Sequence, residues 1–226
     1  MNRPYDPWRR TFAVIFTGQA FSLLGSAAVN FALVWWLALE TGSTAVLAYA
    51  SIAAILPQGL LGPLGGPFVD RWDRRRTMIS ADLFIALTSA VLVVLFAFGS
   101  ASVGVVIAII ALRSLGAAFH TPASQAAVPM YVPADQLMRV AGWNFFLSSG
   151  AAMAGPVLGA FLIGIAPMTA VIAVDIGGAL LAVGSLLLVR IPHPESRAGE
   201  ASQGGFVAAF VADFVDGWRE LVRIPG

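Results

Sequence analysis

Four ionisable side chains lie inside long apolar stretches of this sequence, where a charge is costly and therefore informative. Arg113 lies near the middle of one stretch, His120 lies further along it, and Asp82 and Asp175 lie in two others. A charged group inside a bilayer costs about 3 kcal/mol or more unless it meets a partner or water. A carboxylate in an apolar site and a histidine can both carry protons. These residues are therefore candidates for proton or ligand coupling.

Each candidate also has a purely structural interpretation. Arg113 can act as a hydrogen-bond hub between helices. Asp82 and Asp175 lie within two or three turns of expected helix starts, where a carboxylate can cap or tether a helix; Asp175 is the deeper. His120 can be a packing histidine near a helix end. Three amides are further candidates for the wall of a cavity, namely Gln19, Asn30 and Asn144.

The composition identifies a membrane protein. Of 226 residues, 58% are hydrophobic and 11% are charged, and the mean hydropathy is +0.84. Soluble domains carry about 25% charged residues. There is no cysteine and there are two histidines, which argues against a metal site. With a net charge of +1 and no paired catalytic carboxylates, nucleophile–base set or phosphate loop, we expect neither nucleic-acid binding, nor an enzyme, nor a cofactor.

Six segments are long and apolar enough to cross a bilayer, which requires about 20 residues in a helix. They are residues 11–37, 44–69, 77–98, 102–123, 137–164 and 168–189. All thirteen basic residues are arginines. Every one except Arg113 lies at the N-terminus, in the second loop, in or next to the fourth loop (Arg139, at the start of the fifth span), or after the sixth span. The positive-inside rule therefore predicts a multi-pass protein of the cell inner or plasma membrane with both termini in the cytoplasm.

The two halves of this region resemble each other. Gly62-Pro63 recurs as Gly155-Pro156, and Asp82 recurs as Asp175, both at an offset of 93 residues; Gly25 and Gly116 are 91 apart. Chance matches among small residues are the alternative. Three spans per copy invert the second copy in the membrane. The predicted fold class is an all-α membrane protein with six transmembrane helices arranged as a 3+3 inverted repeat.

The segment from Gly66 to Arg76 contains the end of the second span and joins it to the third. It resembles the loop pattern of the major facilitator superfamily, Gly-x-Leu-Ala-Asp-Arg-x-Gly-Arg-Arg/Lys, with Asp73 in place of the second glycine. The resemblance implies half of a major facilitator fold and a gating role for this loop, against the alternative of an arginine cluster that only sets topology. The implied gating residues are Gly66, Asp70, Arg71, Arg74 and Arg75.

The fifth span contains Gly155-Pro156-Val-Leu-Gly159, which resembles the antiporter signature of drug exporters in that family. Proline bends a helix and glycine permits close contact, although ordinary small-residue packing is the alternative. Residues 113–133 and the segment around Asp175 resemble the macrolide-efflux branch of the drug:proton antiporters. The resemblance implies export of amphipathic drugs or macrolide-like compounds driven by the proton gradient. The alternatives are another exporter, such as one for a siderophore, and a non-transporting membrane fragment or assembly partner.

The end of the sequence differs from the rest. We expect residues 1–195 to form the six-helix bundle and residues 196–226 to form a polar linker and an amphipathic helix on the cytoplasmic surface. In the resembled family such a segment precedes a seventh span. The expected partners are therefore membrane lipid, a small-molecule substrate, and either a C-terminal six-helix half or a second copy of this chain.

Overall fold

Two glycines in the left-handed backbone region close turns at the same end of the helices. Gly42 has φ of +58° and Gly99 has φ of +63°, a region that glycine enters without steric cost. Gly42 lets α1 (Pro7–Thr41) reverse into α2 (Thr44–Arg71), and Gly99 lets α3 (Arg74–Ala97) reverse into α4 (Val103–Tyr131). The chain continues through the short 3-10 helix η1 (Ala134–Gln136), α5 (Leu137–Ile165) and α6 (Met168–Leu188).

The computed structural model describes residues 7–189, and side chains within 8–62 and 72–189. Within these residues there are six helices long and apolar enough to cross a membrane and no strands. Each predicted span overlaps one of these helices, so the all-α, six-span prediction is confirmed. The predicted linker and amphipathic helix at 196–226 lie outside the described residues.

The predicted end of the fourth span was wrong. Helix α4 continues to Tyr131, with Pro122 and Pro129 inside it. A proline removes one helical hydrogen bond. A membrane helix tolerates this loss when neighbouring helices and local adjustments satisfy the freed groups. The helix therefore ends at Tyr131, next to Val132 and Pro133, rather than near Ala123.

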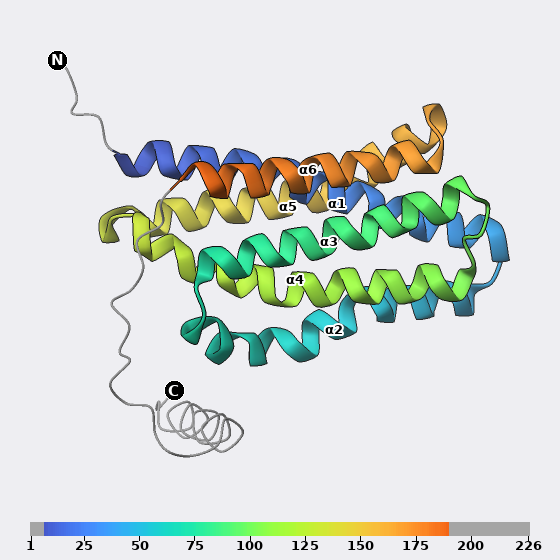
Figure 1. Cartoon of the computed structure of the whole chain (residues 1–226), viewed down its shortest axis with the longest axis horizontal. Helices are drawn as coiled ribbons and strands as arrows, with labels where there is room; N and C mark the ends of the chain where they lie inside the picture. The colour runs from blue at the N-terminus through green and yellow to red at the C-terminus, as the bar shows by residue number, and fades with distance from the viewer. Residues whose placement is uncertain (1–6, 190–226) are drawn as a thin grey trace. The chain divides into compact units, whose positions relative to one another are not determined.

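The contacts between helices give the packing order α5, α1, α6, α3, α4, α2, of which α3, α4 and α2 are seen side by side in Figure 1. Helix α1 packs against α5 and α6, α4 packs against α2 and α3, and α3 packs against α6. This list of packed helix pairs stays the same when the labels α1 and α4, α2 and α5, and α3 and α6 are exchanged. The arrangement is the one expected for a 3+3 inverted repeat.

Two apolar clusters separate the ends of the bundle from a polar middle layer. One includes Leu33, Leu37 and Leu92 on the side of the Gly42 and Gly99 turns, and the other includes Ile15 and Met78 at the opposite end. Between them lie buried polar side chains, of which Ser22, Asp82, Ser89, Arg113 and Asp175 are at most 8% exposed. The middle layer is therefore where a polar site can form away from both membrane surfaces.

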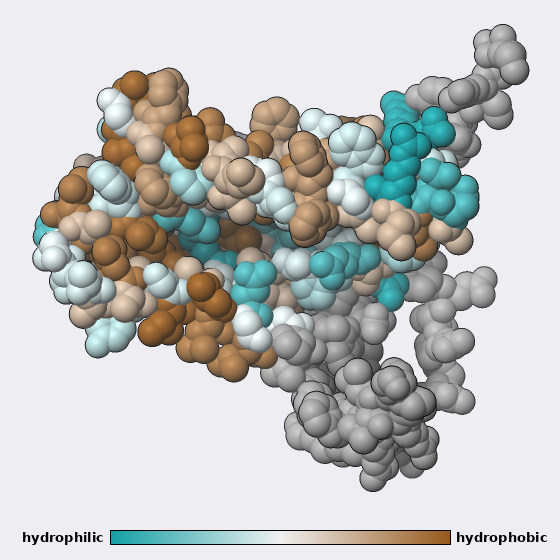
Figure 2. All heavy atoms as spheres, turned by 180° about the vertical axis from the view of Figure 1, so that it is seen from behind, coloured by the Kyte–Doolittle hydropathy of each residue, from teal (hydrophilic) through white to brown (hydrophobic). Residues whose placement is uncertain are grey.

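Large apolar side chains cover much of the outside of the bundle, as the brown areas of Figure 2 show. Ile55 on α2 and Phe145, Val157 and Phe161 on α5 are each more than half exposed. A soluble monomer rarely exposes so large an apolar surface. These faces are suited to contact lipid or another apolar helix.

Candidate functional site

Arg113 and Asp175 form a buried ion pair at the centre of the bundle. The Arg113 Nη1 atom lies 2.5 Å from Asp175 Oδ2, and the two side chains are 4% and 0% exposed. The Ser26 hydroxyl donates to Asp175 Oδ1 at 2.6 Å, and the Ser89 hydroxyl donates to Oδ2 at 2.6 Å. Arg113 also donates to Ser89. The four side chains come from α1, α3, α4 and α6, so this network ties four helices together.

A second polar cluster surrounds Asp82, which is 3% exposed. The Gln19 side chain donates from Nε2 to Asp82 Oδ2 at 3.3 Å. The Nε2 atom of His120 lies 3.5 Å from Asp82 Oδ1, at ion-pair distance. That His120 nitrogen is buried and has no hydrogen-bond partner among the described residues. The Asp82 carboxylate is therefore held more loosely than the Asp175 carboxylate.

The two clusters are copies of one another. The helix positions correspond at offsets of 94 residues between α1 and α4 (113 − 19 and 120 − 26) and 93 between α3 and α6 (175 − 82). The Oδ2 atom contacts Gln19 in the Asp82 cluster and Arg113 in the Asp175 cluster. The Oδ1 atom contacts His120 in the first of these clusters and Ser26 in the second. The corresponding residues are Gln19 with Arg113, Ser26 with His120, and Asp82 with Asp175.

The correspondence of the two clusters shows that one of the residue matches used to identify the sequence repeat was wrong. The predicted match of Gly25 with Gly116 requires an offset of 91, three residues short of the observed 94. Gly25 packs against Asp175, whereas Gly116 packs against Ile85 and Phe84. Three residues are nearly one helical turn, so Gly116 lies on almost the same helix face as the residue of α4 that corresponds to Gly25. The two glycines were therefore matched in error. The correspondence of Asp82 with Asp175 is unaffected.

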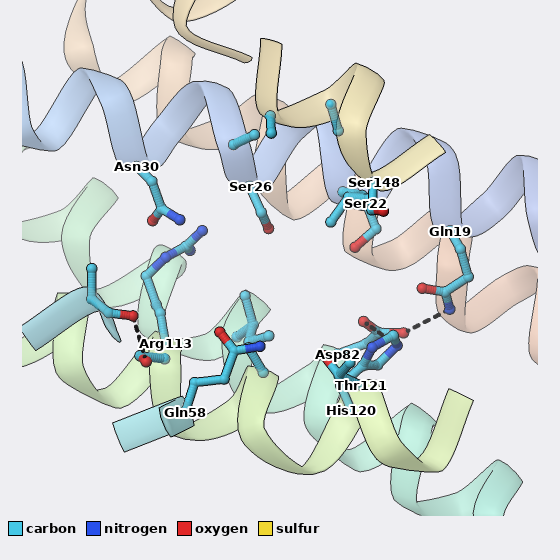
Figure 3. A pocket seen from close by; sticks show the side chains of 18 of the residues that line it. Gln19, Ser22, Ser26, Asn30, Gln58, Asp82, Arg113, His120, Thr121 and Ser148 are labelled. Carbon is cyan, nitrogen blue, oxygen red and sulfur yellow. Dashed lines mark hydrogen bonds and ion pairs between the residues drawn. The ribbon is translucent and has the colours of Figure 1, made fainter. Parts of the chain in front are cut away.

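Both clusters border an open cavity of about 310 Å³ (Figure 3). Five helices, α1 to α5, contribute to its wall. In Figure 2 the polar side chains gather in a hollow between bands of mostly apolar side chains. The polar side chains of the wall are Gln19, Ser22, Ser26, Asn30, Gln58, Asp82, Arg113, Ser114, His120, Thr121 and Ser148.

Some of these wall residues were not predicted. On α1, Gln19, Ser22, Ser26 and Asn30 recur at intervals of three and four residues and form one polar stripe facing the cavity (Figure 3). This period marks one face of a helix and could have identified the two serines from the sequence. Asn144, which was predicted as a wall residue, is not among the residues that line this cavity.

Comparison with known proteins identifies the family. The model of the Major Facilitator Superfamily matches residues 15–225. This chain belongs to the major facilitator superfamily. It is therefore a multi-pass membrane protein, and its six helices form half of a major facilitator fold.

Individual relatives within the superfamily match a large part of the chain. Macrolide efflux protein A of Streptococcus pyogenes is 39% identical over 193 residues, which is 85% of this chain and 48% of that protein. The protein of the same name from Enterococcus faecalis is 40% identical over 156 residues, 69% of this chain and 48% of that protein. An uncharacterized MFS-type transporter of Mycobacterium bovis is 30% identical over 193 residues, 79% of this chain and 42% of that protein. The chain thus spans about half the length of the curated relatives it matches.

The superfamily loop between α2 and α3 is a two-residue connection, Trp72 and Asp73. Asp73, which replaces the family's glycine, caps α3 by accepting a hydrogen bond from the Arg76 backbone at 3.1 Å. Arg74 donates to the Met130 sulfur at 3.5 Å. The remaining predicted gating residues, Gly66, Asp70 and Arg71, lie in the last turns of α2, and their side chains lie outside those that the structure describes.

Arg75, the last predicted gating residue, reaches the end of another helix. Its Nε donates to the Leu186 carbonyl oxygen at 2.8 Å, and its Nη2 donates to the Leu187 carbonyl oxygen at 3.1 Å. The last carbonyls of a helix lack intrahelical partners and attract cations. Arg75 therefore joins the start of α3 to the end of α6.

The segment of α5 that resembles the antiporter signature, Gly155 to Gly159, packs against α1. A Cβ atom at Gly159 would lie 2.6 Å from the Ala28 carbonyl oxygen, and one at Gly155 would collide with the Ala27 side chain. Helix α5 continues through Pro156. The two glycines thus allow α5 to approach α1 along the cavity wall, as small residues do in membrane helix packing.

Proposed function

We propose that this chain is the N-terminal six-helix half of a secondary active exporter that uses the proton gradient to expel amphipathic, macrolide-like compounds. The observation that carries the proposal is the polar cavity in the middle layer of the bundle, open on one side and bordered by both charged clusters. Transporters of this class bind substrate near the membrane midplane between two repeats. The names of the Streptococcus and Enterococcus relatives support macrolides as the substrate class.

A second six-helix unit would close the open side of this cavity. Alternating access requires two units that rock against each other around the site. The chain spans about half the length of its curated relatives, which supports a C-terminal half or a second copy of this chain as the missing unit. The apolar faces of α2 and α5 would contact that unit and membrane lipid.

Transport in inside-out vesicles tests this function. Vesicles from cells that express this chain with its neighbouring coding sequence are expected to accumulate a radiolabelled macrolide when the lumen is acidic. The accumulation should disappear when an ionophore collapses the pH gradient. Vesicles without the protein provide the control. Accumulation that persists without a gradient, or that requires ATP, contradicts the proposal.

The orientation of the helices in the membrane can be tested separately by labelling single introduced cysteines. The chain contains no cysteine of its own that would have to be removed first. We propose that both termini are cytoplasmic in the cytoplasmic membrane, with the Gly42 and Gly99 turns outside. A Ser43→Cys or Ser100→Cys variant is therefore expected to react with a membrane-impermeant maleimide in intact cells. Asp135→Cys, between α4 and α5, should react only after permeabilisation. The opposite labelling pattern contradicts this topology.

A further inference from the structure

A small pocket lies between the starts of α1 and α5, and its lining residues differ from those of the central cavity. Its volume is about 170 Å³. Pockets for drug-sized ligands measure roughly 300–1,000 Å³, so this pocket fits only a smaller group. Each helix supplies three lining residues, which are Trp8, Arg9 and Phe12 from α1, and Arg139, Val140 and Trp143 from α5.

This pocket brings together two arginines from different helices. The side chains of Arg9 and Arg139 are both exposed, and Figure 2 shows hydrophilic side chains gathered at this end of the bundle. The Arg9 guanidinium lies over the Trp8 ring, 5.5 Å from its centroid, and this cation–π contact orients it. Arg139 makes no hydrogen bond or ion pair with the described residues. Since arginine binds phosphate groups through paired N–H donors, an anion between the two helices can bond to both.

Aromatic side chains continue from the pocket toward the middle of each helix. On α5, Trp143 packs edge-on against Phe146 with ring centroids 6.2 Å apart, and Phe146 is 68% exposed. On α1, the rings of Phe12 and Phe16 are 5.2 Å apart. The arginines thus lie at the end of the bundle, and exposed apolar surface begins one turn further in. An anionic phospholipid presents the same order, with its phosphate at the membrane surface and its acyl chains inside, and tryptophan favours the boundary between the two.

We propose that Arg9 and Arg139 hold the phosphate of an anionic phospholipid in this pocket. Trp8 and Trp143 flank the glycerol region of the lipid, and its acyl chains lie along the exposed apolar side chains of α5. Basic pockets between transmembrane helices bind anionic head groups in this way. The bound lipid bridges the starts of α1 and α5. This inference requires only that the bundle crosses a membrane, and it does not depend on the transported compound.

Native mass spectrometry of the purified chain in detergent, titrated with phosphatidylglycerol, tests the site. The unmodified chain should bind one molecule of this lipid more tightly than phosphatidylcholine, whose head group has no net charge. Arg9→Gln and Arg139→Gln should each weaken the binding of phosphatidylglycerol about fivefold, the effect of losing one arginine contact to an anionic lipid. The double variant should weaken it about 25-fold. Arg139→Lys keeps the charge and should retain most of the binding.

Arg10→Gln is the matched control. Arg10 is the next residue of α1, and its side chain is exposed and does not line the pocket. This substitution removes the same charge from the same end of the bundle, so it lowers the general attraction for anionic lipid and leaves the pocket intact. The affinity for phosphatidylglycerol should therefore change by less than about twofold.

Three results would overturn the site. The first is equal weakening by Arg9→Gln, Arg10→Gln and Arg139→Gln, which would show that only the overall charge attracts the lipid. The second is equal affinity for phosphatidylglycerol and phosphatidylcholine. The third is displacement of the bound lipid by an equal concentration of glycerol 3-phosphate, which would identify a site for free phosphate esters. We expect no displacement, because this soluble fragment lacks the acyl chains.

Discussion

The Asp175→Asn variant is expected to lose about 3–5 kcal/mol of folding free energy, because it leaves the Arg113 guanidinium buried without a counter-charge. Arg113 is 4% exposed, and the exchange of oxygen for nitrogen keeps the shape of the side chain. Ser26 and Ser89 can still bond to asparagine, so the loss reports the missing charge. Thermal or denaturant unfolding of the purified chain in detergent measures it.

A double-mutant cycle shows whether the two charges depend on each other. Arg113→Met alone leaves the Asp175 carboxylate unpaired and should cost a similar amount. The combined variant removes both charges, so it should recover much of the loss, as replacing a buried pair by apolar residues often does. Asp135→Asn, at an exposed position of η1, is the matched control and should change little. Additive losses in the double variant would contradict a coupled pair.

Gly178→Ala is expected to destabilise the bundle by about 1–3 kcal/mol through overpacking between α6 and α1. A Cβ atom at Gly178 would lie 2.7 Å from the Phe21 carbonyl oxygen and 3.0 Å from the Ser22 Cα. Both neighbours are backbone atoms, so the two helices must move apart. Because Ser22 and Ser26 lie on the same part of α1, this separation should also loosen the hydrogen bond from Ser26 to Asp175.

The neighbouring residue provides a matched control for this substitution. A Cβ atom at Gly177 would meet nothing within 4 Å. Gly177→Ala should therefore show only the intrinsic gain of alanine over glycine in a helix, up to about 1 kcal/mol. The difference in unfolding free energy between the two variants isolates the contact between α6 and α1. Equal stabilities would show that these helices do not pack as closely as described.

The spans and their connections could be predicted because they depend on local properties. Length, hydropathy and the placement of arginine determine a membrane helix and its ends. The prediction failed at α4, where the span was expected to end near Ala123, next to Pro122, although the helix continues to Tyr131. A proline interrupts a helix in water more readily than one that is packed in a membrane protein.

The pairing of the charged residues could not be predicted because it depends on which helices face each other. Arg113 was expected to need a partner or water, and either Asp82 or Asp175 could have served. The sequence repeat placed both aspartates in equivalent positions, but one sequence alone did not show that α4 presents Arg113 to Asp175 and His120 to Asp82. An alignment error of one turn, as at Gly25 and Gly116, is enough to change the partner.

Arg75 links the start of helix α3 to the C-terminal end of α6. Its guanidinium donates hydrogen bonds to the carbonyl oxygens of Leu186 and Leu187 in the last turn of α6. Asp82 lies seven residues further along α3, two turns away on nearly the same side of the helix. The two hydrogen bonds of Arg75 therefore connect the end of α6 to the part of α3 that holds the Asp82 carboxylate.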